Sequence, residues 1–209
     1  AEIAAGVAHE INNPLASISQ AMQLLKQAVD PAHPHWEYVG RIEECIARMA
    51  RITRQMYDLF PSRDRAVRVL DLRTVVNRTM EIMEHAAAKR GIRLHATLPN
   101  EKCLARCEQS ELLQILCNLI RNAMDASSTN QDVSVGVKQQ GDSVDIVVSD
   151  KGTGISPQVA SHIFEPFYTT KSQAEQRGMG MGLSVSRSLI EAMGGVLTFS
   201  SIEGKGSTF

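Results

Sequence analysis

The 209-residue chain has few aromatic residues, almost no net charge and no long apolar run. Aromatics are 4% of the residues and the formal net charge is −1, so neither a basic field nor stacking rings point to nucleic acid. No segment reaches the ~20 consecutive apolar residues of a membrane span. Hydrophobic residues are 43% and charged residues 22% of the chain, which is typical of a globular protein with a real core. We expect no nucleic acid and no membrane contact within this chain.

Cysteine is also scarce, with only four residues in the chain, Cys45, Cys103, Cys107 and Cys117. A three-residue gap separates Cys103 from Cys107, but no second Cys or His pair completes a zinc site. We expect reduced thiols in the core or in strands, and a cytoplasmic location.

The sequence starts inside a helical pattern and stops at residues 206–209, which resemble the start of a strand. It lacks the basic n-region of a signal peptide. We expect a fragment of a longer protein, whose sensor, membrane anchor or receiver domain would lie outside it.

Two apolar series at helical spacing occupy the first 61 residues. The first series consists of Ile3, Val7, Ile11, Leu15, Ile18, Met22, Leu25 and Val29. The second runs from Val39 to Leu59, between a Pro-rich break at 30–34 and Pro61. Two such helices form an antiparallel hairpin, which cannot bury both of its apolar seams alone. We therefore predict a homodimer in which two hairpins, each spanning residues 1–61, form a four-helix bundle.

A polar linker at 62–68 precedes a mixed α and β pattern over residues 69–209. Strands are predicted at 67–72, 92–98, 103–107, 133–139, 144–149, 196–201 and from 207 onward. Helices are predicted at 73–90, 108–127 and from about 184 to 193. The Gly-rich stretch 151–180 is long for a loop, which favours a lid that folds over a ligand.

The stretch around His9 contains the groups needed to accept and release a phosphoryl group. Glu10 follows the imidazole directly, and Asn13 lies four residues on, hence on the same helix face. On its own this pattern could arise by chance.

Asn118 and Asn122 lie one turn apart on a predicted helix face. Two neutral amides can cap a metal-bridged phosphate without adding negative charge. Taken alone, they could equally be ordinary surface asparagines.

Asp150 ends a strand of Val and Ile residues and is followed by Gly152 and Gly154. A carboxylate in this position can accept a hydrogen bond from an exocyclic amine such as N6 of adenine, and the glycines allow a close backbone approach. As a single motif it could also be a tight turn.

The run from Gly178 to Leu183 contains Gly178, Gly180 and Gly182 ahead of a predicted helix. Glycines before a helix N-terminus favour an anion site, because free N–H groups and the helix dipole point at the anion. No strand leads into this run and no Gly-Lys-Ser/Thr follows it, so the Rossmann and Walker patterns are both excluded.

In this order, the motifs resemble those of the sensor histidine kinases of bacterial two-component systems. Residues 9–15 are similar to the histidine box, 118–123 to the asparagine box and 150–154 to the first glycine box. Residues 163–171 are similar to the phenylalanine box and 178–183 to the second glycine box. The forms of the first and fourth boxes are most similar to the nitrogen- and oxygen-sensing kinases. The resemblance implies an α plus α/β fold, with a dimerising helical hairpin followed by a Bergerat-type ATP-binding sandwich that this chain does not complete.

The resemblance implies a protein-histidine kinase that uses ATP and Mg²⁺. His9 would attack the γ-phosphate, with Glu10 as the candidate base, and the phosphoryl group would pass to an aspartate of a response regulator receiver domain. Asn122 would hold Mg²⁺, Asn118 would help to position the phosphates, and Asp150 would fix adenine. The spacing of Glu10 and Asn13 is similar to the family's phosphatase pattern, in which an amide orients water.

Further nucleotide contacts implied by the resemblance come from both glycine boxes and from the lid. Gly152 and Gly154 would let the site close, and the N–H groups of Gly180 and Gly182 would meet the phosphates. The remaining candidates are Arg121, Tyr168, Lys171, Arg177, Gly178 and Leu183.

Two other functions compete with the kinase. Chaperone-like and mismatch-repair ATPases of the same fold place a catalytic Glu about one turn before the position of Asn122. Here Gln114 and Asn118 occupy the preceding turns, so no carboxylate is available to activate water. A nucleotide-binding module without turnover is disfavoured because none of the motifs is missing.

Overall fold

The computed structural model describes residues 14, 17–18, 20–22, 24–30, 33–58, 67–170 and 180–209. The chain forms two compact units, residues 1–63 and 64–209. Six of the predicted site residues lie outside the described residues: His9, Glu10, Asn13, Lys171, Arg177 and Gly178.

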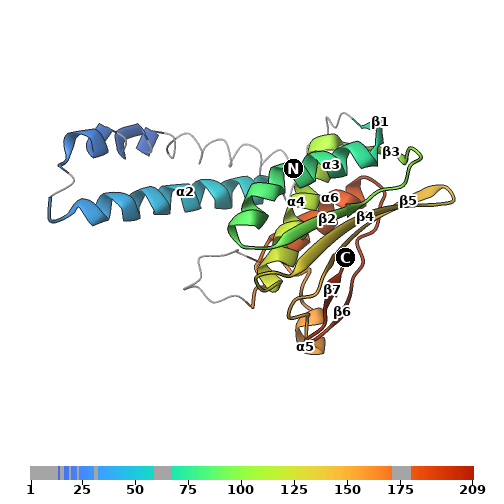
Figure 1. Cartoon of the computed structure of the whole chain (residues 1–209). Helices are drawn as coiled ribbons and strands as arrows, with labels where there is room; N and C mark the ends of the chain where they lie inside the picture. The colour runs from blue at the N-terminus through green and yellow to red at the C-terminus, as the bar shows by residue number, and fades with distance from the viewer. Residues whose placement is uncertain are drawn as a thin grey trace. The chain divides into compact units, whose positions relative to one another are not determined.

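The described part of the first unit is a helical hairpin (Figure 1). Residues 20–22 and 24–28 are helical, and α2 spans Trp36–Asp58, starting three residues before the predicted Val39. Met22 and Ile46 are buried against each other, and an ion pair joins Lys26 Nζ to Glu43 Oε2 at 2.7 Å. These two contacts between the helices fix their antiparallel register.

This hairpin leaves much of its apolar surface uncovered. The exposed large apolar side chains are Ile18, Leu24, Leu25, Ile42 and Met49, with exposed fractions of 44–62%. Two helices bury only the side chains at their mutual interface, so apolar side chains on other helix faces remain exposed.

The second unit combines strands and helices. Its elements are β1 (Arg68–Asp71), α3 (Leu72–Lys89), β2 (Arg93–Thr97), β3 (Leu104–Cys107), α4 (Gln109–Ala126), β4 (Asp132–Gln140), β5 (Ser143–Asp150), α5 (Pro157–Ala160), α6 (Gly182–Ala192), β6 (Ser200–Ile202) and β7 (Gly206–Thr208). The predicted mixed α and β fold is confirmed. The strand predicted at 196–201 was wrong in its first part, because residues 196–199 are not in a strand.

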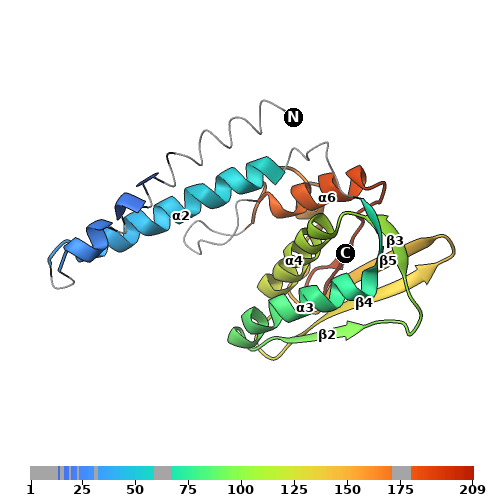
Figure 2. The ribbon, with the colours of Figure 1, turned by 90° about the horizontal axis from the view of Figure 1, so that it is seen from above.

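The main sheet has the strand order β2-β4-β5-β7-β6, and β1 pairs with β3 in a separate two-stranded sheet. Only β2 and β4 run parallel; the other neighbours are antiparallel. Helices α3, α4 and α6 lie together on one side of the strands (Figure 2). The second unit is therefore a two-layer sandwich of helices on a sheet.

The core lies between these two layers. Val133, Val135 and Val137 alternate along β4 and are at most 6% exposed, whereas the residues between them are not fully buried. From α4, Leu116 and Ile120 are 2% and 0% exposed. The period of two in the strand and the helical period in α4 thus place both apolar faces against each other. None of the helices in the described ranges is long and apolar enough to cross a bilayer.

Asp71 joins β1 to the start of α3. Its Oδ1 accepts hydrogen bonds from the Arg73 N–H at 3.2 Å and from the Cys103 N–H at 3.3 Å, and its Oδ2 pairs with Arg73 Nη2 at 2.7 Å. The carboxylate caps the helix and ties it to the residue before β3. The bond to the Arg73 side chain is the main reason why the pKa of Asp71 falls to about 2.

The chain after β5 passes very close to the backbone of two other elements. A Cβ at Gly152 would overlap the Ala126 carbonyl at the end of α4, and a Cβ at Gly154 would overlap the Ile202 carbonyl of β6. Gly154 also has a φ of +65°, which disfavours any residue with a Cβ. The Thr153 N–H donates to the Ala126 carbonyl at 3.1 Å. The turn is therefore held between α4 and the β6–β7 hairpin.

We predict that Asp71→Asn removes part of the acid sensitivity of this protein. The folded-state pKa of Asp71, about 2, lies below its ordinary value of 3.8, so its stabilising contribution is present above about pH 4 and is lost as the pH falls toward about 2. Asn retains a capping oxygen but cannot titrate. Urea unfolding between pH 2 and 5 should show a shallower pH dependence for Asp71→Asn than for wild type or for the turn variant Asp142→Asn. The same pH dependence of stability in wild type and Asp71→Asn would contradict this role of Asp71.

Gly154→Ala should destabilise the protein more than Gly141→Ala does. Both glycines have positive φ, +65° and +57°, but nothing lies within 4 Å of a Cβ built on Gly141. Backbone strain alone costs about 1–2 kcal/mol, and the overlap at Gly154 adds at least ~1 kcal/mol. Chemical unfolding of the two variants measures the difference. Equal losses of stability would show that the contact with β6 is not tight.

Candidate functional site

Asp150 lies at the end of β5 and is only 8% exposed. Its Oδ1 accepts hydrogen bonds from the Gly152 N–H at 2.8 Å and the Ser207 N–H at 3.3 Å. No partner for Oδ2 is recorded among the described residues, so this oxygen has acceptor capacity left for a ligand. Burial raises the pKa of the Asp150 carboxyl, and the two backbone donors oppose that rise. The Asp150 carboxylate is thus fixed by two backbone N–H groups and shielded from water, and its free oxygen can accept a hydrogen bond from an amine.

One face of α4 connects the two glycine-containing segments. Asn118, Asn122 and Ala126 follow one another at intervals of four residues and so share that face. Asn118 lies beside the start of α6, since its amide is 3.9 Å from a Cβ built on Gly182 and its Nδ2 is 3.5 Å from Ser186 Oγ. Ala126 meets Gly152 at the other end. Asn122, which is half-buried, lies between them.

The start of α6 offers backbone donors. Gly182 is its first residue, which places the helix start two residues before the predicted Ser184. The cap residue Met181 supplies no side-chain acceptor for the first turn, and no other described residue accepts from the Gly182 and Leu183 N–H groups. Within the described part of the chain, these donors are therefore available for an anion. Leu183 is half-buried in the same turn.

Gly180, just before α6, lies against the backbone of Tyr168. It has a φ of +69°, and a Cβ there would overlap the Tyr168 carbonyl. Tyr168 itself is half-buried, with its ring 5.3 Å from the ring of His162. The two motifs at 163–171 and 178–183 are therefore adjacent at Gly180 and Tyr168.

Aromatic contacts attach Phe164, in the middle of the stretch 151–180, to the rest of the unit. The Phe164 ring lies 5.8 Å from the Phe199 ring, and Phe199 stacks on Phe209 at 5.8 Å. Arg187 of α6 places its guanidinium 5.2 Å from the Phe164 ring centre. Phe164 is thus anchored to α6 and to the aromatic residues near the end of the chain.

The groups at this site fit a purine nucleotide with its phosphates toward α6. Asp150 provides a buried acceptor at one end of α4, and the amides of Asn118 and Asn122 lead toward the free donors of α6. In the described ranges, no three His, Cys, Asp or Glu side chains gather to hold a metal. A magnesium ion here would fit the single amide oxygen of Asn122, with phosphate oxygens and water completing its shell.

The structure places the described site residues as follows. Asp150, Gly152, Asn118, Asn122 and Gly182 are linked along α4, and Gly180 meets Tyr168. Arg121 is exposed on α4, and no hydrogen bond or ion pair of its side chain is recorded in the described part of the chain.

Sequence reasoning missed the residues that complete the turn around Asp150. Ser207 donates to its carboxylate, and a Cβ at Gly206 would overlap the Asp150 carbonyl. Ala126 carries no polar side chain, so no sequence signal identifies its carbonyl as a contact. Gly204 and Gly206 near the end of the chain were a usable signal for close backbone approach.

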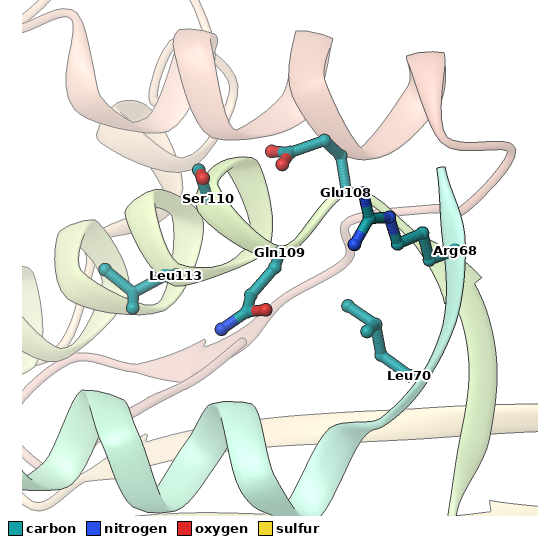
Figure 3. A pocket seen from close by; sticks show the side chains of 6 residues that line it. All are labelled: Arg68, Leu70, Glu108, Gln109, Ser110 and Leu113. Atoms are coloured by element: carbon teal, nitrogen blue, oxygen red, sulfur yellow. The ribbon is translucent and has the colours of Figure 1, made fainter. Parts of the chain in front are cut away.

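A separate hollow of about 520 Å³ lies between β1 and the start of α4 (Figure 3). Its lining residues are Arg68, Leu70, Glu108, Gln109, Ser110 and Leu113. The lining thus combines one cation, one carboxylate, two neutral polar side chains and two leucines. None of the residues predicted to bind nucleotide lines it.

Two family models match this chain. Residues 1–63 match the His Kinase A (phospho-acceptor) domain, and residues 107–209 match the histidine kinase-, DNA gyrase B- and HSP90-like ATPase. Sensor histidine kinase ZraS of Escherichia coli (strain K12) is 32% identical over 207 residues, which are 99% of this chain and 44% of that protein. The chain thus spans less than half the length of this curated relative.

Solved structures share the fold over the whole chain. Full-length ShkA in complex with AMPPNP has a TM-score of 0.84 at 24% identity, covering 100% of this chain and 44% of that one. Histidine kinase ThkA in complex with response regulator protein TrrA has a TM-score of 0.68 at 24% identity, covering 100% and 60%. The two domain matches and the similarity to ZraS show that the chain belongs to the sensor histidine kinases.

Proposed function

We propose that this chain is a kinase core that phosphorylates His9 from ATP and passes the phosphoryl group to an aspartate of a response regulator. The observation that carries the proposal is the face of α4, which joins the buried acceptor Asp150 to the free donors at the start of α6 through two neutral amides. That arrangement separates an adenine end from a phosphate end.

Each end of the proposed site has its own recognition chemistry. Oδ2 of Asp150 accepts a hydrogen bond from the exocyclic amine of adenine, while the first turn of α6 binds phosphate oxygens. Asn118 and Asn122 add no charge that would repel the phosphates. Mg²⁺, when bound at Asn122, offsets negative charge on the phosphates during transfer. The AMPPNP bound by the similar kinase ShkA supports nucleotide binding at this fold.

The phosphoryl acceptor in this proposal is the neutral imidazole of His9. One ring nitrogen attacks the γ-phosphorus, the bond from that phosphorus to the bridging oxygen breaks, and ADP leaves with the electron pair. Glu10 accepts a hydrogen bond from the other ring nitrogen and stabilises the positive charge that develops on the ring. Both residues lie in the match to the phospho-acceptor domain, residues 1–63.

We further propose three parts: a hairpin at 1–61, a linker at 62–68 and an ATP-binding domain from 69 onward. The division of the chain into units 1–63 and 64–209 supports this arrangement. The uncovered apolar side chains of the hairpin, such as Leu25 and Ile42, support pairing with a second copy into a four-helix bundle. The complex of ThkA with TrrA supports a receiver domain as the second partner.

Incubation with γ-labelled ATP and Mg²⁺ should place an acid-labile, base-stable label on the wild-type chain and none on His9→Gln, which lacks the accepting nitrogen. His33→Gln is the matched control, because His33 is exposed in the turn of the same hairpin. It should label at the wild-type rate. A His9→Gln chain that labels normally would overturn the proposal, as would ATP hydrolysis without labelling of wild type.

Asn13→Ala should slow the removal of phosphate from the phosphorylated receiver domain by at least about tenfold, because it removes the amide that orients the attacking water. Autophosphorylation of His9 should continue in the same variant and serves as its internal control. The decay of labelled receiver domain, followed with wild-type and variant chains, measures the effect. Native phosphate removal by Asn13→Ala would exclude this phosphatase role.

A further inference from the structure

We propose that Gln131 is a positioning residue that sets adenine affinity by holding the turn after Asp150 against the end of α4. The inference rests on the proposed function, because it concerns how the same nucleotide site is held in shape. Gln131 does not belong to any of the motifs and lies in the connection between α4 and β4.

The side-chain amide of Gln131 bridges two segments that are far apart in sequence. Its Oε1 accepts a hydrogen bond from the Ser128 N–H at 2.7 Å, and its Nε2 donates to the Lys151 carbonyl at 3.0 Å. Ser128 lies two residues after α4, and Lys151 directly follows Asp150. One amide therefore ties the helix that carries Asn118 and Asn122 to the strand end that carries the adenine acceptor.

The backbone of Gln131 is itself fixed. Its carbonyl accepts from the Arg93 N–H at 3.0 Å, and its N–H donates to the Ser128 carbonyl at 3.2 Å. The side chain is half-buried. Because both of its backbone groups are bonded, the side chain starts from a fixed position, and its own two hydrogen bonds then hold the amide against Lys151.

The bond to the Lys151 carbonyl adds a second restraint to the peptide between Lys151 and Gly152, whose N–H already donates to Asp150. Gly152 donates to Asp150 Oδ1, and Thr153 is held by Ala126 and Gly204. Gln131 therefore holds the carbonyl side of the peptide whose N–H side holds the Asp150 carboxylate, and rotation of this peptide would break its bond to Asp150. A ligand that binds a site already in its bound geometry loses less free energy to ordering. Gln131 thus preorganises the adenine acceptor.

Gln131→Glu distinguishes the hydrogen bond to Ser128 from the hydrogen bond to Lys151. The variant keeps an oxygen that accepts from Ser128 but replaces the donor to Lys151 with a carboxylate oxygen, which faces a carbonyl and cannot bond to it. Gln131→Met removes both hydrogen bonds without adding charge. Gln139→Glu is the matched control, because Gln139 Nε2 donates to the Gly141 carbonyl at 2.7 Å in the β4–β5 turn. It loses the same type of bond with the same change of charge.

The experiment measures calorimetric affinities of the full chain for Mg·ADP and Mg·IDP. Inosine carries an oxygen in place of the N6 amine, so it cannot donate the amine hydrogen bond to Asp150. We expect Gln131→Glu and Gln131→Met to weaken ADP about three- to tenfold, the size expected for one hydrogen bond. The affinity ratio of ADP to IDP should fall in both variants, and Gln139→Glu should retain the wild-type ratio.

Three results would overturn the inference. One is an unchanged ADP to IDP ratio in both Gln131 variants. Another is a parallel loss of both nucleotides together with a lowered thermal unfolding midpoint, which would make Gln131 only a structural residue. In either case wild type still binds ADP and the proposed function stands. Wild type that binds neither nucleotide would instead refute the proposed function, and this inference with it.

Discussion

The geometry of the site depends on one constraint, the close packing of the turn after β5 against the last residues of α4. There is no space for a side chain at Gly152, because the Ala126 carbonyl occupies it. A helix is stiff along its axis, so the distance from this contact to the first turn of α6 is set by the number of α4 residues between them. The two asparagines lie within that span. The spacing of the polar groups is therefore a property of helix geometry rather than of side-chain flexibility.

The described part of the site uses backbone groups where other sites use charged side chains. Asp150 is buried, and its carboxylate is held by backbone N–H groups instead of by a cation. At the other end, the donors at the start of α6 come from the backbone. Between them lie neutral amides. Cations that meet the phosphates would then come from the lid, as the sequence resemblance implies for Lys171 and Arg177.

Much of this fold could be predicted from the sequence, because its elements follow simple periodicities. The alternation at Val133, Val135 and Val137 predicted β4, and the apolar series through Leu116 and Ile120 predicted α4. Single residues were also informative about where helices end, since Gly91 follows the end of α3. The start of β6 could not be predicted, because residues 196–199 carry strand-forming side chains yet pair with no neighbour.

The candidate site was predictable where it depends on side-chain chemistry and not where it depends on backbone contacts. Asp150 and the two asparagines stood out because carboxylates and amides bind ligands. The Ala126 carbonyl and the Ser207 N–H carry no such signal, since every residue has these groups. The bridge through Gln131 was hidden for a related reason: a glutamine near a turn has many possible partners, and only the fold selects Lys151.

The hydrogen bond from Ser207 to Asp150 joins residues 57 positions apart. We expect this bond to form late in folding, because β5 can pair with β4 through a short turn, whereas the bond also needs the β6–β7 hairpin. Loop closure over such a separation is slow compared with local pairing. A nascent chain would thus hold a nearly complete sheet and helix layer while Asp150 still lacks one of its two backbone donors. Binding competence would arrive as one of the last steps in the maturation of this domain, after most of its core has formed.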